Sequence, residues 1–160
     1  MFGISKDKSF KRKYEDKTSS MVSLAFEYVN NDKENIDAIY IYGSNEEGFV
    51  YYDCFFNINH VLLERHRIND TGLNFDISDQ MQLKFIKYAN QDLKGLIELF
   101  KKYKKDIPTQ IKMEYYPKTG KFDCFLDYDI HYSNKSDGTP DEVAESWFKE
   151  LKLKIEPRSR

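Results

Sequence analysis

The chain has 160 residues, a length that suits one compact domain better than two. Its aromatic content of 16% excludes a disordered chain, because disordered chains have too little apolar area to form a core. The net charge of -2 conceals basic segments at residues 1–20, 81–113 and 146–160 and acidic segments at 31–80 and 114–145. Because the most aromatic segments are the acidic ones, this pattern disfavours direct binding of nucleic acid, which needs aromatic side chains among basic ones.

The N-terminal part of the chain predicts a tail, a helix and a strand pair. Residues 1–18 are predicted to form a frayed basic segment, because the first eight are polar and bury little, and residues 19–155 to form the single domain. A helical pattern emerges between about Phe10 and Asn30, where apolar residues recur three and four positions apart. β-Branched and aromatic residues then predict strands at 36–42 and 49–58, joined by a turn rich in Gly, Ser and Asn.

The remainder predicts a second group of elements after an irregular connector at 59–76. A long helix begins near Ser78, whose hydroxyl can cap it, and ends before Pro108, with a kink at Asn90 left open. Alternation predicts strands at 110–116 and 121–129. Thr139, Pro140 and Glu142 then predict a helix that starts with a capping box.

This order of elements predicts an α+β fold. We expect two layers, in which an antiparallel sheet of about four strands, formed by two hairpins, packs one face against N-terminal, central and C-terminal helices. In the strand at 49–58, the predicted core face consists of Val50, Tyr52, Cys54, Phe56 and Ile58. In the strand at 121–129, the predicted outward face consists of Asp123, Phe125, Asp127 and Asp129.

Residue patterns typical of catalysis and cofactor binding are missing from the sequence. It holds no Gly-rich phosphate loop, no Gly-x-Ser-x-Gly turn and no cluster with zinc-ligand spacing, so we predict no enzyme and no cofactor. The carboxylates of Asp123, Asp127 and Asp129 could form a solvated face, a surface that binds a partner, or a metal site.

Three features bear on the compartment. The first residues lack the apolar core of a secretory signal, and no apolar stretch approaches the ~20 residues that span a bilayer. Cys54 and Cys124 are in no CxxC spacing and are predicted to be unpaired thiols in a reducing environment. The sequence therefore predicts a cytoplasmic protein that is not in a membrane, and leaves its oligomeric state open.

Residues 107–151 resemble the YezG-like immunity (antitoxin) family of Gram-positive bacteria. The stretches that carry the resemblance are Ile107-Pro108-Thr109-Gln110-Ile111-Lys112, Tyr115, Thr119-Gly120-Lys121-Phe122-Asp123, Leu126-Asp127-Tyr128-Asp129, Tyr132-Ser133-Asn134, Thr139-Pro140-Asp141-Glu142 and Trp147-Phe148-x-Glu150. Gln110 departs from the pattern, which has an acid there. The resemblance implies a cytoplasmic protein that neutralises a secreted toxin, often a nuclease exported by a type VII system, without catalytic residues or cofactor.

The favoured hypothesis is therefore a stoichiometric inhibitor that occludes a cognate toxin. The carboxylates predicted to contact the toxin are Glu114, Asp123, Asp127, Asp129, Glu46, Glu47 and Asp53. Two alternatives stay open: a metal-dependent hydrolase that uses Asp127, Asp129 and His131, and a small-ligand module with a pocket between sheet and helices.

Overall fold

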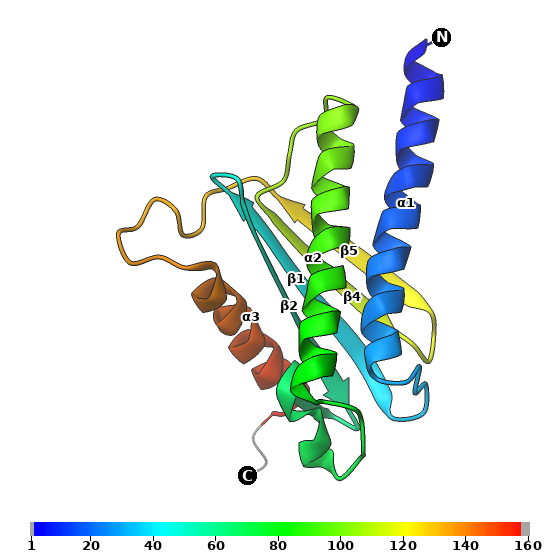
Figure 1. The fold of residues 1–160 in the computed structure, drawn as a ribbon, viewed down its shortest axis with the longest axis vertical. Coiled ribbons are helices and arrows are strands. Elements are labelled where there is room, and N and C mark those ends of the chain that lie inside the picture. Colours follow the sequence, from blue (N-terminus) through cyan, green and yellow to red (C-terminus); the bar gives the residue numbers. More distant parts are fainter. Residues whose placement is uncertain (1, 158–160) are drawn as a thin grey trace.

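The computed structural model describes residues 2–157, which form three α-helices, one short 3-10 helix and five strands (Figure 1). In chain order the elements are α1 (Phe2–Tyr28), β1 (Ile36–Glu46), β2 (Phe49–Ile58), β3 (Val61–Glu64), η1 (Arg65–Thr71), α2 (Asp79–Lys102), β4 (Gln110–Tyr116), β5 (Lys121–Asp127) and α3 (Pro140–Ile155). The strands form one antiparallel sheet in the order β3-β2-β1-β4-β5, which confirms the predicted α+β class. Within residues 2–157, no helix has the length and apolar character needed to cross a membrane.

Helix α1 is longer than the sequence pattern predicts. Met1 lies outside the described residues, but the rest of the segment 1–18 is helical and not irregular. The ring of Phe10 packs edge-on against Phe100 of α2 and against Tyr103, the residue that follows α2, at centroid distances of 5.4 and 5.6 Å. Tyr14 also contacts Phe100. The basic segment therefore has an apolar face, formed by Phe10 and Tyr14. The polar composition of the first eight residues gives no sign of this face.

The connector after β2 contains a strand that was not predicted. Strand β3 pairs with the second half of β2, from Ile58 opposite Val61 to Phe55 opposite Glu64. Four residues are too few to show a clear alternation, so this strand gives no periodic signal. Within the part of the chain that the structure describes, no strand pairs with the first half of β2, from Phe49 to Cys54, on that side.

The two predicted helix starts have different outcomes. The Ser78 hydroxyl accepts a hydrogen bond of 3.2 Å from the Met81 amide, which confirms the cap, and α2 then continues through Asn90 without a break. Thr139 and Pro140 also stand at the start of α3 as predicted. However, the Thr139 side chain makes no capping hydrogen bond within the described residues, so the capping box does not form.

The sheet is covered on both faces, and the expectation of two layers is wrong. Helices α1 and α2 bury one face, which includes most of the core predicted for β2, whereas α3 packs on the opposite face (Figure 1). The core beneath α3 consists of Ala38, Tyr40, Tyr42, Phe55, Leu62, Ala144, Trp147 and Leu151. Because β1 and β2 carry large apolar side chains on both faces, a single helical layer would leave one set in water.

Both cysteines are free thiols, as predicted. Cys54 is buried in the core under α1 and α2, and burial raises its pKa to about 12. Cys124 is half-buried and accepts a hydrogen bond of 3.1 Å from the Tyr14 hydroxyl, and burial raises its pKa as well. Both side chains therefore act as neutral packing groups at physiological pH.

The second core can be tested with Trp147→Ala. The indole contacts the rings of Tyr40 and Phe55, so its removal should lower the free energy of unfolding by about 3–5 kcal/mol in urea denaturation. Leu153→Ala on the same helix is the control, because its side chain is 68% exposed and should change stability by less than about 0.5 kcal/mol. Equal effects of the two substitutions would contradict a core beneath α3.

Candidate functional site

Part of the sheet face that carries α3 is not covered by this helix. The core beneath α3 draws its sheet residues from β1, β2 and β3, and Figure 1 shows α3 on the β2 side of the sheet, away from β5. The side chains that β4 and β5 direct to this face therefore lie beside the helix. We call this surface the outer acidic face; it consists of Lys112, Glu114, Asp123, Phe125 and Asp127.

Two of the predicted interface carboxylates meet on this face. Glu114 of β4 and Asp123 of β5 are directly opposite each other in the strand register. The Tyr116 hydroxyl donates a hydrogen bond of 2.7 Å to Glu114, and the Lys121 ammonium lies 3.7 Å from Asp123. Both carboxylates are partly exposed, so they are available to a partner at a spacing fixed by the backbone.

An exposed aromatic ring lies among these acids. Phe125 is 54% exposed, and it faces Lys112 across the β4–β5 pair. The Lys112 ammonium lies 5.1 Å from the Trp147 ring centre, and burial lowers its pKa although Glu150 and Asp127 act in the opposite direction. The predicted outward face of this strand includes Phe125, but the predicted site residues do not. The signal in the sequence is an aromatic residue that alternates with acidic ones.

Asp127 organises the loop that follows β5. One of its oxygens accepts hydrogen bonds from the amides of Tyr128 and Asp129, at 2.6 and 3.0 Å, and the other lies 2.9 Å from His131 Nε2. Donation from the Asp129 amide, with that from Tyr128 and the contact with His131, lowers the pKa of Asp127. The exposed Asp129 holds the same loop through its carbonyl, which accepts a bond of 2.6 Å from the Thr109 hydroxyl.

The trio proposed for a metal-dependent hydrolase is only partly assembled. Asp127 and His131 form a hydrogen-bonded pair. Nevertheless, residues 2–157 include no group of three or more His, Cys, Asp or Glu side chains placed to hold a metal ion.

Glu46 is a structural residue, and its burial removes it from the carboxylates that could contact a partner directly. It is only 2% exposed, and it accepts hydrogen bonds from the amides of His131, Tyr132 and Ser133 at 2.9, 3.4 and 3.0 Å. Burial alone would raise the pKa of Glu46, but the amides of Ser133 and His131 outweigh it and lower the pKa. The carboxylate thus anchors the loop between β5 and α3.

The other two predicted interface residues lie apart from the outer acidic face. Asp53 is on β2, separated from β4 by β1, where it accepts a bond of 2.8 Å from the Cys54 amide and lies 3.6 Å from the Arg65 guanidinium. Burial raises the pKa of Asp53, although Arg65 opposes this. Glu47 is exposed in the turn between β1 and β2, with a left-handed φ of 53°. The structure therefore separates the predicted set into distinct locations.

The role of Glu46 can be tested by Glu46→Gln. This change should cost about 1–3 kcal/mol of stability at neutral pH, because it removes the buried charge to which three backbone amides donate. The pKa of Glu46 in the folded protein lies below its ordinary 4.5, so its stabilising effect is lost as the pH falls below that value. Urea denaturation across pH should show the difference from the wild type shrinking in acid. A pH-independent difference, or an equal effect of Glu47→Gln, would contradict this role.

The chain was also compared with known proteins. Neither the models of protein families nor the curated proteins include a match to it. The resemblance to the YezG-like family therefore remains a prediction from the residues that carry it.

Proposed function

We propose that this protein is an immunity protein that binds a cognate bacterial toxin, a nuclease domain, and neutralises it by stoichiometric occlusion. The observation that carries the proposal is the outer acidic face, where the exposed ring of Phe125 lies beside the carboxylates of Glu114 and Asp123. Two further side chains about half exposed, Tyr128 and Ile130, follow directly at the end of β5.

The chemistry of this face suits a cationic partner. A nuclease binds the phosphate backbone of its substrate with basic side chains, so an ordered pair of carboxylates can occupy the same cleft. Opposite charges also steer the two proteins together and raise the rate of association. Because Glu114 and Asp123 lie on hydrogen-bonded strands, little backbone order has to be gained on binding.

Phe125 would supply the affinity that exposed charges lack. Exposed ion pairs contribute about 0–1 kcal/mol each, whereas aromatic side chains that enter a pocket of the partner are common hot spots. An aromatic ring with an acidic rim is the arrangement expected of a surface that binds a basic protein.

The resemblance of residues 107–151 to the YezG-like family supports the same proposal. Such a protein works in the cytoplasm of the toxin producer and requires neither a cofactor nor a chemical step of its own. The outer acidic face lies within the segment that carries this resemblance, on β4 and β5.

The proposal can be tested by co-expression with the toxin encoded next to this gene. The wild type should rescue growth and form a 1:1 complex with the toxin. Phe125→Ala should weaken that complex by about 30-fold or more, the effect of losing a hot spot. The double change Glu114→Gln/Asp123→Asn should slow association and flatten its dependence on salt.

Glu27→Gln/Glu34→Gln is the matched control, since it removes the same charge from exposed positions elsewhere on the protein. The control should bind like the wild type in calorimetry. Full affinity of the Phe125→Ala protein would place the interface elsewhere, and failure to bind any adjacent toxin would refute the proposed function.

A further inference from the structure

Two basic segments that are far apart in the sequence meet at one end of the molecule. The N-terminal half of α1 and the C-terminal end of α2 lie side by side in Figure 1, and the contacts of Phe10 with Phe100 and Tyr103 hold them together. Lysines recur in both segments, at positions 6, 8, 11 and 13 of α1 and at positions 101, 102, 104 and 105 around the end of α2. The fold thus concentrates positive charge at this end.

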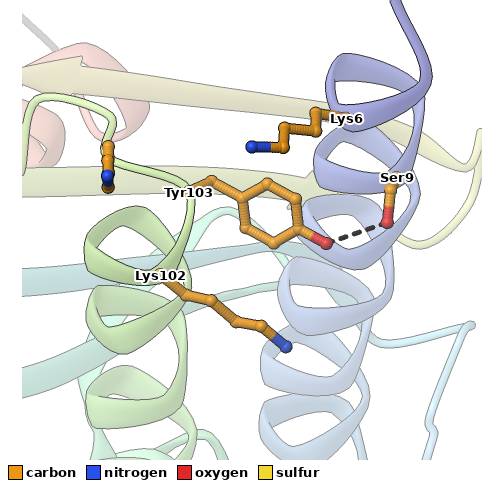
Figure 2. Close-up of a pocket in the computed structure, with 5 residues that line it drawn as sticks. Lys6, Ser9, Lys102 and Tyr103 are labelled. Atoms are coloured by element: carbon orange, nitrogen blue, oxygen red, sulfur yellow. Dashed lines mark hydrogen bonds between the residues drawn. The ribbon is translucent and has the colours of Figure 1, made fainter. Parts of the chain in front are cut away.

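A hollow of about 390 Å³ opens between these segments. It is lined by Lys6 and Ser9 of α1 and by Lys102, Tyr103 and Lys104 at the end of α2. Figure 2 shows Lys6 and Lys102 on opposite sides of the Tyr103 ring, while the Tyr103 and Ser9 hydroxyls share a hydrogen bond of 2.8 Å. The hollow therefore has ammonium groups on more than one side and two hydroxyl groups at its wall.

Three lysines of this hollow have no ion-pair partner among residues 2–157. None of the ion pairs among the described residues includes Lys6, Lys102 or Lys104, whereas the neighbouring Lys105 pairs with Asp7 at 3.1 Å. A further ammonium, that of Lys13, lies 5.5 Å from the centre of the Tyr103 ring. Like charges gathered around one hollow repel each other, and an anion placed between them would relieve that repulsion.

Stabilisation of the α2 C-terminus accounts for only part of this cluster. Cations in the last turn of a helix interact favourably with its dipole, which explains Lys101 and Lys102. It does not explain Lys6, which belongs to α1, or the conformation of Lys104. Lys104 has a φ of 54° just beyond the helix, a position where glycine is usual because a side chain is unfavourable there. A lysine at this position is unfavourable for the backbone but adds a charge to the hollow.

We propose that this hollow binds a small ligand that carries two or more phosphate groups. The ammonium groups of Lys6, Lys102 and Lys104 would contact the phosphate oxygens. Of the Ser9 and Tyr103 hydroxyls, the one that accepts the hydrogen bond between them keeps its own proton free and would donate it to a phosphate oxygen. The volume of the hollow is in the range of pockets that hold small molecules. This site shares no residue with the outer acidic face, so the inference does not depend on the proposed function.

The first test is calorimetric titration of the full chain with tripolyphosphate at low salt. We expect one saturable site, and Lys102→Gln/Lys104→Gln should weaken binding by about 20-fold, as expected for the loss of two exposed charge contacts. Lys84→Gln/Lys94→Gln is the control, because it removes the same charge from exposed positions elsewhere on α2 and should bind like the wild type. No saturable binding, or an equal loss in both variants, would overturn the proposal.

Lys104→Gly separates binding from folding. Glycine suits the left-handed backbone at this position, so the midpoint of thermal unfolding should stay the same or rise. Binding of tripolyphosphate should nevertheless weaken by about fivefold, because one ammonium is lost. A variant that binds as tightly as the wild type would show that Lys104 does not contact the ligand and would overturn the proposed site.

A second ligand distinguishes the possible sources of phosphate. A short single-stranded oligonucleotide should bind no more tightly than tripolyphosphate and should be displaced by it. Binding of the oligonucleotide without any binding of tripolyphosphate would overturn the proposal and indicate a nucleic-acid surface instead.

Discussion

Strand β1 lies between β2 and β4, and its side chains alternate between two separate cores. Its isoleucines are buried under α1 and α2, while Tyr40 and Tyr42 pack against Trp147 of α3. Because both faces are buried, a shift of register by one residue would move every side chain of β1 into the wrong core. The fixed position of β1 sets the register of β4. The tight turn between β4 and β5 then sets the register of β5, and this places Glu114 and Asp123 opposite each other.

The same arrangement gives the molecule two surfaces of opposite charge. Helix α3 packs on residues of β1, β2 and β3 and leaves the outer acidic face, on β4 and β5, open. On the opposite face, α1 and α2 extend side by side to the lysine-rich hollow. A net charge of only -2 therefore coexists with strong local fields, which act on partners more than on stability. The two proposed ligands, a basic protein and a polyphosphate, correspond to these two surfaces.

Local signals in the sequence predict most of the helices and strands. Where the structure differs from the prediction, long-range contacts are the main reason. The hydroxyl of Ser78 and the alternation of residues 110–116 depend on neighbours in the chain, so they could be recognised. The spacing of Trp147 showed that α3 buries a face, but not which face of the sheet it covers. Glu46 binds amides more than 80 residues away, which no local pattern reveals. The hollow between α1 and α2 depends equally on tertiary packing.

The proposed function requires that another protein binds against the outer acidic face. Amide hydrogen exchange measures this most directly, because it compares the same chain alone and in complex with the adjacent toxin. If this surface is the interface, exchange in the complex should be slower over β5 and the loop that follows it, residues 121–133, with little change in α2. Protection confined to α1 and α2, with β5 unchanged, would contradict it.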